Sequence, residues 1–362
     1  MPARSLSKSP SRSVSANVLK ALRQEGVSSE VLEARLQWAG AVQLLTHYIK
    51  KLEGVERVFP SMIPTQASGR WSTKGPPLPN VPDRYQNVVW PDPGSYWIKW
   101  DYSSIEAKIV SALCQDQEDL EAFEHDHDIH TLTACKALGL PFPPVRTKAL
   151  HTSPECAVWR EQVGWKGAKD PRRDVFKVAR YGLAYGYDAN ALLGVRGVED
   201  LGITRAELLK AGQLYLRSKP RLAAWKKTTW TEAYRARETR TFLGRRRRLF
   251  PTAREIVLFE QTGRPGDTAK EGLNHIVQGA VADVLNLTII EIAKRWPECY
   301  LVLNAHDSGM FSFPLEIECW PEIRESVERE WEVTQGGKVR FTAEWVRFES
   351  DGSKQYYNLE GH

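Results

Sequence analysis

The chain has 362 residues, 42% of them hydrophobic, which is enough to bury a core and, at roughly 150 residues per domain, to form two or three packed subdomains. This composition excludes a disordered or fibrous protein, and a net charge of +5 is too small to indicate a partner by itself. Five cysteines without a CxxC pair argue against a disulfide framework or a zinc site and favour a reducing, intracellular setting. With neither a run of roughly 18 apolar residues nor an apolar N-terminal signal, we expect no membrane association.

The first hundred residues predict a tail, a short helical region and a loop. Residues 1–15 are basic and rich in Ser, so we expect a disordered tail, although an organelle transit segment has the same composition. Apolar residues at three- and four-residue steps predict one or two helices over 16–53. Residues 59–95 are rich in Pro, Gly, Ser and Thr and predict a loop or linker. The aromatic run 97–103 then predicts a strand with Asp101 near its end, followed by a helix.

The middle of the chain predicts mainly helices. Residues 140–170 are irregular, and a helix begins at Pro171, a residue favoured in the first turn. Successive i+4 positions of this helix carry two cations and two aromatic residues, which drift slowly around one broad face: Arg173, Lys177, Tyr181 and Tyr185. Further helices are predicted over 203–237 and 269–296, separated by a strand, a turn and a second strand.

The C-terminal region contains the clearest local pattern. CYLVLN and MFSFP, joined by a short polar turn, predict a β-hairpin with His306 and Asp307 at its tip. An amphipathic helix over 318–334 and a closing strand over 339–348 are predicted to follow.

Asp101 and Asp307 are candidate metal ligands. Nucleotidyl transfer requires two divalent cations about 3.5–4 Å apart, and carboxylates must hold both. Strand pairing could bring these two aspartates together although they are far apart in the sequence. In isolation, however, an aspartate at a turn is usually a turn-former, and one before a helix is usually a cap.

Three segments in the same order as in a known family favour the metal-site interpretation. They are DYSSIEAK at 101–108, RRDVFKVARYGLAYG at 172–186 and LNAHDSGMF at 303–311. These segments resemble the three polymerase motifs of the A family of DNA polymerases, typified by bacterial DNA polymerase I. Two further segments, 68–82 and 274–279, resemble the stretches of that family that contact the primer, the template and the DNA minor groove. The resemblance covers roughly residues 60 to 350.

The resemblance implies roles for individual residues around the reacting groups. Asp101, Asp307 and the backbone carbonyl of Tyr102 match metal ligands, so Mg²⁺, in two ions, with Mn²⁺ as a substitute, is the expected cofactor. Arg173 and Lys177 match residues that contact the incoming triphosphate, and cations suit that task because they neutralise charge that develops on the phosphates. A solvated basic face is the alternative for these two residues.

Further matches concern the nucleotide's sugar and base. Tyr181 and Tyr185 match aromatic positions that pack against the sugar and the bases, although core aromatics are the commoner role for such residues. His306, which neighbours Asp307, is also expected to bind the nucleotide. Glu106 matches the glutamate that crowds the 2′ position of the sugar and so selects deoxyribonucleotides; alone, it would be an ordinary first-turn helix acid.

Another group matches positions that contact primer or template. Neutral amides suit the minor groove, whose acceptors are present at every base pair, so they can check pair shape without reading sequence. The four consecutive arginines from 245 to 248 fit phosphate contacts, with a solvated surface as the alternative. The expected DNA-binding residues are Arg70, Asn80, Asn274, Gln278, Arg245 and Arg246.

The sequence also departs from the family pattern. Ser308 stands where an acid is common, which leaves two carboxylates for the metals. Tyr181 stands where Phe is usual, and variants with Tyr resemble enzymes that accept dideoxynucleotides readily. Residues 1–82 contain no aspartate, so we expect no 3′→5′ exonuclease in this chain, a thumb limited to the first helices, and a weak grip on DNA. More irregular sequence than the family usually has lies at about 141–171, where a partner-binding or DNA-contacting insertion is an open interpretation.

The predicted fold is α+β: a polymerase right hand with an antiparallel-sheet palm, helical fingers and a reduced helical thumb. The predicted divisions are a disordered basic tail (1–15), a reduced thumb (16–58), the first part of the palm with Asp101 (59–114), fingers with the insertion (115–265) and the second part of the palm with Asp307 (266–362).

The predicted function is template-directed DNA polymerisation from a primer 3′-hydroxyl without proofreading. The alternatives are a catalytically silent DNA-binding subunit and an RNA polymerase or primase of the same superfamily; Glu106 disfavours the latter. The expected partners are primer-template DNA, dNTPs and a separate exonuclease, helicase, primase or processivity factor. The source is expected to be phage-like or a mobile element, and the protein is expected in the cytoplasm of a bacterial or phage-infected cell.

Overall fold

A computed structural model describes residues 30–74, 89–186, 189–190, 195, 201 and 204–357, without the side chains of His47 and Tyr357. The predicted tail at 1–15, the start of the first helical region and Asn80 lie outside the described residues. The chain divides into two compact units, residues 1–61 with 73–83 and residues 62–72 with 84–362, and each is described by itself. This division does not separate fingers from palm, so the predicted domain boundaries remain predictions.

The first unit contains helical residues 30–52, as the sequence pattern predicts. Helix α2 (Glu30–Leu44) continues through a π-helical turn, η1 (Leu45–Ile49), into the short α3 (Lys50–Leu52). Most side chains of α2 are exposed, and Leu32 is the only buried residue of this helix.

The second unit contains the larger set of elements. Its α-helices are α4 (Ile105–Cys114), α5 (Gln117–Glu124), α6 (Ile129–Leu138), α7 (Ala157–Val163), α8 (Pro171–Ala184), α9 (Arg205–Arg217), α10 (Pro220–Ala236), α11 (Ala253–Thr262), α12 (Asp267–Arg295) and α13 (Trp320–Val327). Three 3₁₀ turns are η4 (Lys148–His151), η5 (Pro154–Cys156) and η6 (Gly167–Lys169). The strands of the chain are β1 (Ser61–Ile63), β2 (Ser72–Lys74), β3 (Ser95–Tyr102), β4 (Glu238–Arg240), β5 (Arg246–Arg248), β6 (Tyr300–Ala305), β7 (Ser308–Pro314), β8 (Glu330–Thr334), β9 (Gly337–Arg340), β10 (Ala343–Phe348) and β11 (Lys354–Tyr357).

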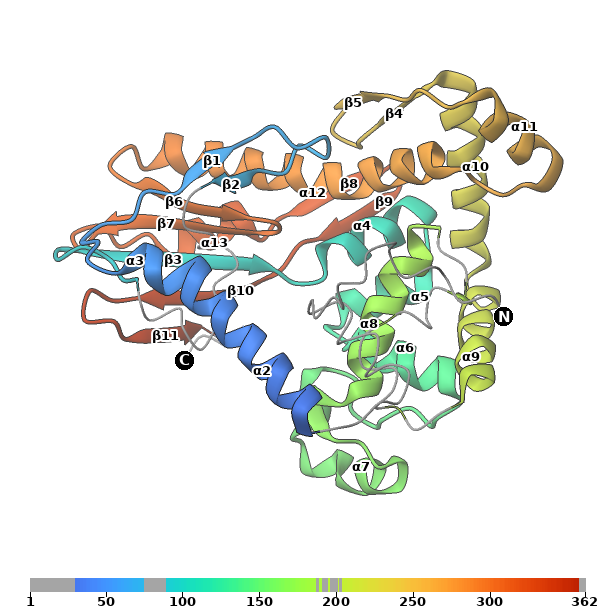
Figure 1. Cartoon of the computed structure of the whole chain (residues 1–362), viewed down its shortest axis with the longest axis horizontal. Coiled ribbons are helices and arrows are strands. Elements are labelled where there is room, and N and C mark those ends of the chain that lie inside the picture. Colours follow the sequence, from blue (N-terminus) through green and yellow to red (C-terminus); the bar gives the residue numbers. More distant parts are fainter. Residues whose placement is uncertain are drawn as a thin grey trace. The chain divides into compact units, whose positions relative to one another are not determined.

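A five-stranded antiparallel sheet with the order β11-β10-β3-β7-β6 places β3 at its centre (Figure 1). Side chains along β3 alternate, and Tyr96, Ile98, Trp100 and Tyr102 are buried on one face. Asp101 therefore points to the opposite face, where it is exposed.

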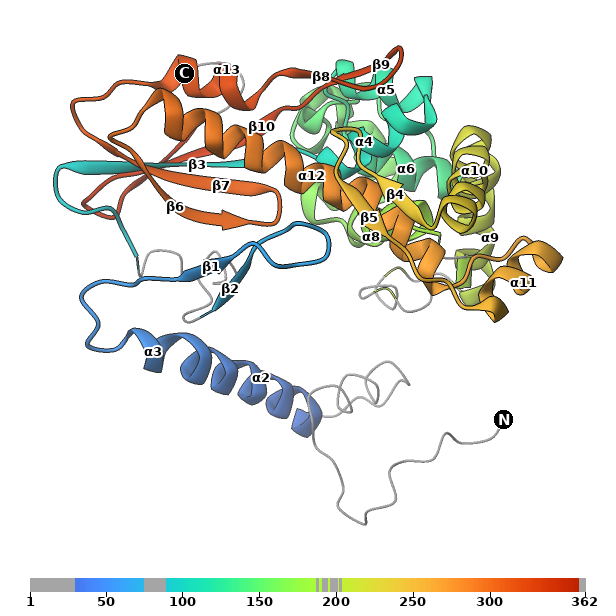
Figure 2. The same ribbon diagram turned by 90° about the horizontal axis from the view of Figure 1, so that it is seen from above.

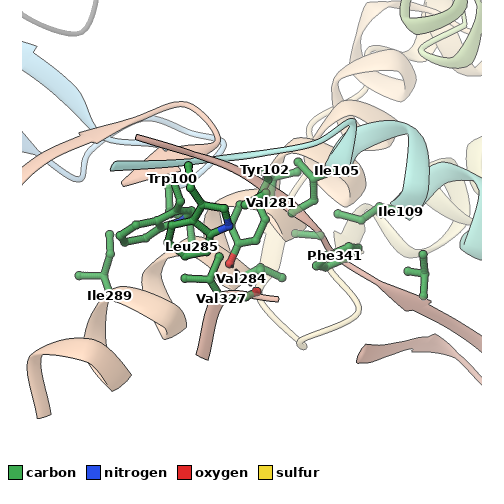
Figure 3. Close-up of a cluster of buried hydrophobic side chains, with 14 of the residues drawn as sticks. Trp100, Tyr102, Ile105, Ile109, Val281, Val284, Leu285, Ile289, Val327 and Phe341 are labelled. Carbon is green, nitrogen blue, oxygen red and sulfur yellow. Dashed lines mark hydrogen bonds between the residues drawn. The ribbon is translucent and has the colours of Figure 1, made fainter. Parts of the chain in front are cut away.

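The covered face of the sheet packs against α12, as Figure 2 shows from above. Figure 3 shows the contact: Trp100 and Tyr102 of β3 lie against the apolar residues of α12, among them Val281, Val284 and Leu285. Trp100 and Phe311 of β7 stack with ring centroids 6.2 Å apart. Large aromatic side chains bury about 150–250 Å² each, so this layer contributes much of the hydrophobic stabilisation of the unit.

Helix α12 is long and apolar enough, by length and composition, to cross a membrane. However, 56% of its most apolar window is buried inside the fold, which is how a helix at the centre of a core behaves. Among the described residues no other helix meets that test, and this one does not indicate a membrane span.

The predicted hairpin is present as β6 and β7. Ala305 pairs with Ser308, so His306 and Asp307 form a two-residue turn. His306 has a φ of 57°, a left-handed conformation that the first position of such hairpin turns requires and that histidine tolerates better than most residues. The tight turn fixes the direction in which Asp307 leaves the sheet.

The helical region beside the sheet differs from the sequence expectation in one segment. Residues 140–170, predicted to be irregular, contain η4, η5, α7 and η6. Their Leu150, Cys156, Trp159 and Trp165 are buried in a second core, together with Phe176 of α8. These tryptophans are therefore structural, and they do not form an exposed surface for a partner or for DNA.

The prediction of one helix over 318–334 was wrong in its second half. Helix α13 ends at Val327, and residues 330–334 form β8, which pairs with β9. The alternating EWEVT pattern and the turn at Gly336, whose φ is +78°, favour a hairpin there. The predicted closing strand is likewise divided between β9 and β10, and β11 adds an edge strand.

Gly309 of β7 is expected to be essential for this packing. It lies opposite Trp100, and a β-carbon at this position would lie 2.3 Å from Trp100 Cζ2. We therefore expect Gly309→Ala to lower the free energy of unfolding by about 1–3 kcal/mol, since the buried indole has no room to move. Chemical denaturation measures this.

Ser312→Ala on the same strand is the matched control. The Ser312 hydroxyl is buried and has no hydrogen-bond partner among the described residues, so its removal should leave stability unchanged or raise it slightly. If Gly309→Ala were as stable as the native chain, the proposed close approach of Trp100 would be wrong.

Candidate active site

The two predicted metal-binding carboxylates lie side by side at one end of the central sheet. Asp101 on β3 pairs with Ser308 on β7, the residue directly after Asp307. The Tyr102 amide donates a hydrogen bond of 3.1 Å to the Asp307 carbonyl, which continues the ladder into the turn. Main-chain pairing therefore brings Asp101 and Asp307 together, as the sequence predicts.

The electrostatics of this pair favour a cation. Partial desolvation by the surrounding protein, and then the charge of Asp307, raise the pKa of Asp101 to about 6, whereas Lys99 and Lys177 oppose the rise. Burial also raises the pKa of Asp307, against the opposing charges of Arg70 and His306. The Asp101 side chain remains exposed, so water screens part of this repulsion, and ions can enter. A divalent cation would relieve the repulsion that remains.

The other predicted ligands refine the donor set. The Tyr102 side chain is buried, with its hydroxyl 3.1 Å from Thr288 Oγ1, so only its backbone carbonyl is available to a metal. Ser308 donates its hydroxyl to the Ala305 carbonyl at 2.9 Å and closes the hairpin. In the described part of the chain no group of three or more His, Cys, Asp or Glu side chains could hold a metal. Two carboxylates and a carbonyl are hard oxygen donors, which fit Mg²⁺ or Mn²⁺ and do not fit zinc.

Helix α8 carries the predicted triphosphate-binding cations. Asp170 caps its N-terminus by accepting a hydrogen bond from the Arg172 amide at 3.0 Å, and Pro171 occupies the first turn. Lys177 is exposed, and its positive charge opposes the rise in the pKa of Asp101. Arg173, one turn earlier, donates to Asp128 from Nε at 2.8 Å and from Nη2 at 3.2 Å.

The predicted sugar gate, Glu106, is fixed by two partners from other segments. One carboxylate oxygen accepts from Arg70 Nη2 and the other accepts from the Tyr185 hydroxyl. Tyr185 is the C-terminal cap of α8, so the gate connects α4, α8 and the segment around Arg70. Burial, and then Glu106, also raise the pKa of Tyr181 to about 12, which keeps its phenol protonated as a donor.

The predicted minor-groove residues that the structure describes lie on α12. Asn274 and Gln278 are half-buried one turn apart, and Asn274 Oδ1 is buried without a hydrogen-bond partner among the described residues. A buried polar atom without a partner is costly, so a hydrogen-bond donor on a ligand would be a natural partner for this amide oxygen. Asn80 lies outside the described residues, and His306 is exposed at the hairpin tip.

The arginines of the predicted phosphate-contacting run differ from one another. Arg245 is held inside the fold: Nε donates to Asp283 at 2.6 Å, and Nη2 donates to the carbonyls of Ser68 at 2.6 Å and Gly279 at 2.8 Å. Arg246 is exposed, with a loose contact of 3.7 Å to Glu238. A phosphate contact remains a prediction for both residues, and Arg246 has the freer guanidinium.

Three residues near the site were not predicted from the sequence. His130 lies 3.4 Å from Ser104 Oγ, its ring centroid is 6.0 Å from that of Tyr181, and burial followed by the charge of Arg180 lowers its pKa to about 3. Asp128 accepts hydrogen bonds from Arg173, and His151 in turn pairs with Asp128. The DHDIH run at the start of α6 places an N-cap aspartate two residues before the buried His130, and this local signal could have indicated Asp128 and His130 but not His151.

Comparisons with known proteins match the chain to one family. The family model described as DNA polymerase family A matches residues 2–345. The thermostable DNA polymerase I of Thermus aquaticus is 26% identical over 324 residues, which cover 85% of this chain and 34% of that protein. The DNA polymerase I of Caldicellulosiruptor bescii is 26% identical, over 87% of this chain and 35% of that protein.

A solved structure shares the fold. The polymerase domain of Pol1 from M. smegmatis, in complex with DNA primer-template and dNTP, superposes with a TM-score of 0.67 at 21% identity. The match covers 95% of this chain and 57% of that one. The fold is thus the α+β polymerase fold that the sequence predicted. The chain belongs to DNA polymerase family A, and it spans about a third of the length of the curated relatives it matches.

The carboxylate pair predicts a divalent-cation site that can be tested without DNA. We expect Mn²⁺ to raise the melting temperature of the native chain, because an ion at 100 times its Kd stabilises the folded state by about 2.7 kcal/mol. Asp101→Asn and Asp307→Asn should each lose most of this gain. Differential scanning fluorimetry with and without EDTA measures the shift.

Asp351→Asn is the control, since Asp351 is an exposed aspartate on the turn between β10 and β11. It should keep the full Mn²⁺ response. An equal response in all four proteins would show that the ion binds elsewhere.

Proposed function

We propose that this chain is a template-directed DNA polymerase that adds deoxyribonucleotides to a primer 3′-hydroxyl and releases pyrophosphate. The observation that carries the proposal is the pairing of β3 with β7, which sets Asp101 beside Asp307 at an exposed sheet end. Family membership and the cationic face of α8 support it.

The residues of the chain divide the work by chemistry. Asp101, Asp307 and the Tyr102 carbonyl would hold two Mg²⁺ ions, for which Mn²⁺ can substitute. Bound there, such ions supply Lewis-acid activation of the attacking hydroxyl and charge neutralisation on the phosphates. Lys177 and Arg173 bind and orient the triphosphate and balance the charge that develops on the leaving group.

Glu106 selects the sugar in this proposal. Its carboxylate is held between Arg70 and Tyr185, so it cannot swing aside to admit a 2′-hydroxyl. A fixed acid that crowds the 2′ position therefore favours dNTPs over ribonucleotides. Asn274, Gln278 and Arg70 contact the minor groove of the primer-template, with Asn80, Arg245 and Arg246 as further expected DNA contacts.

The cellular setting is also a proposal. We expect the protein to act in the cytoplasm of a bacterial or phage-infected cell, with proofreading, primer synthesis, unwinding and processivity supplied by other proteins.

Primer extension tests the proposed function directly. With a DNA template, dNTPs and Mg²⁺, we expect the native chain to extend the primer and Asp307→Ala to lose at least about a thousandfold in rate, because one carboxylate cannot hold both ions. Asp351→Ala, which removes an exposed carboxylate elsewhere, should extend at the native rate. The proposal fails if the native chain and Asp307→Ala extend primers equally.

Tyr181 generates a second prediction, on sugar selection at the 3′ position. Its protonated phenol can replace the 3′-hydroxyl that a dideoxynucleotide lacks, so we expect the native chain to incorporate dideoxynucleotides almost as readily as deoxynucleotides. Tyr181→Phe should restore discrimination by hundreds of fold, measured as the ratio of kcat/KM values. Tyr300→Phe, at an exposed tyrosine, is the control. Strong discrimination already present in the native chain would contradict this role.

A further inference from the structure

A buried carboxylate, Asp128, holds the guanidinium of Arg173. Asp128 caps the N-terminus of α6, and only 2% of its side chain is exposed. Besides the two bonds from Arg173, it accepts hydrogen bonds of 2.8 Å from Thr131 Oγ1 and from His151 Nε2. Burial alone would raise the pKa of Asp128, but His151 and Arg173 hold it well below its usual range, so this carboxylate stays charged.

His151 comes from the segment at 141–170 that the sequence could not explain. It ends η4, and 8% of its side chain is exposed. Trp165 Nε1 donates to His151 Nδ1 at 3.4 Å, so Nδ1 acts as the acceptor and the ring proton is on Nε2, where it is donated to Asp128. Both nitrogens of the ring are thus used, and its orientation is fixed.

The segment is also fastened to the start of α8. Arg172 donates to the carbonyls of Val163 at 2.8 Å and Gly164 at 2.7 Å, and its guanidinium lies 4.7 Å from the Trp165 ring centre. It pairs as well with Asp170, the N-cap of α8. The segment and the first turn of α8 therefore form one rigid arrangement directly before Arg173.

Asp128 binds only one edge of the Arg173 guanidinium. Its Nε and one Nη2 proton point to Asp128, which leaves the three remaining N–H groups, on Nη1 and Nη2, for an anion. Lys177 lies four residues later, one turn along the same helix, and its side chain is exposed, so both cations present donors on one side of α8. A guanidinium that is already ordered loses less rotamer entropy when it binds an anion.

We propose that His151 is a positioning residue for nucleotide binding: it locks Asp128, and Asp128 presents Arg173 to the triphosphate of the incoming nucleotide. This inference rests on the proposed polymerase function. In this proposal the 141–170 segment has a function: it restricts the Arg173 side chain to one orientation. The competing arrangement, in which Asp128 withholds Arg173 from the phosphates, predicts the opposite sign in the test below.

The test removes or restores the His151 donor. His151→Leu removes it, His151→Asn keeps a polar group that is too short to reach Asp128, and His151→Gln places an amide N–H near the position of Nε2. We expect the dNTP Kd, from single-turnover extension, to rise about tenfold for Leu and Asn, to stay within about twofold for Gln, and the maximal rate to change much less. His125→Leu, at the exposed histidine that ends α5, should have no effect.

An Arg173→Ala background shows whether the effect passes through Arg173. There, His151→Leu should add nothing further, since the group that it positions is gone. The proposal is overturned if folded His151→Leu binds dNTP as the native chain does, if it binds more tightly, or if its tenfold loss persists without Arg173. Circular dichroism confirms folding, and the Asn variant serves if the Leu variant does not fold.

Calorimetric binding of inorganic pyrophosphate with Mg²⁺ separates the two proposals. If no protein extends a primer, the polymerase proposal fails, while weaker pyrophosphate binding by the Leu and Asn variants would still support the role of His151. If the native chain extends primers and all variants bind pyrophosphate equally, the His151 proposal alone is wrong.

Discussion

The structure depends on holding two carboxylates side by side against their mutual repulsion. Main-chain pairing does this: the register of β3 with β7 sets Asp101 opposite Ser308, and the Tyr102 amide closes on the Asp307 carbonyl. Backbone hydrogen bonds are indifferent to side-chain charge, so they can impose a spacing that the side chains would avoid. The opposing stabilisation comes from the other face of the same strands, where Trp100 and Phe311 stack and α12 covers them. Alternation along a strand thus lets one residue bury apolar surface while its neighbour presents charge.

The proposed sugar gate and the nearby segment that is expected to contact DNA depend on a second set of fixed contacts. Arg245 joins Asp283 of α12 to the Ser68 carbonyl, and its guanidinium lies so close to Gly69 that a β-carbon there would be 2.2 Å from Nη1. The segment it holds delivers Arg70 to Glu106. An arginine that the sequence suggested for phosphate binding therefore also has an architectural task, and the DNA-facing role within its run is better suited to Arg246.

The sequence was sufficient for the elements whose patterns are local. Asp101 at a strand end, the hairpin at Asp307 and the i+4 face of α8 follow from alternation, turn residues and helical periodicity, and the structure has each of them. The sequence was not sufficient where tertiary contacts determine the secondary structure or the partner of a side chain. The EWEVT segment was assigned to a helix because its amphipathic pattern continues from α13, but pairing with β9 makes it a strand. His151 could not be recognised, because its partner Asp128 lies 23 positions away and is brought close only by folding.

The basic residues of α8 show how partners, and not composition, separate structural from functional cations. Arg172 donates hydrogen bonds to Asp170 and to the carbonyls of Val163 and Gly164, and so it belongs to the scaffold. Arg173 donates two of its N–H groups to Asp128 and has three others available. Lys177 forms no hydrogen bond or ion pair with the described residues. Arg180, later in the same helix, is buried and donates to Asp119 and Thr133, so within α8 the cations that keep donors for an anion are Arg173 and Lys177. A cation that binds a new triphosphate in each catalytic cycle needs a fixed orientation and free hydrogen-bond donors. Arg173 combines the two, because the buried carboxylate of Asp128 binds one edge of its planar guanidinium.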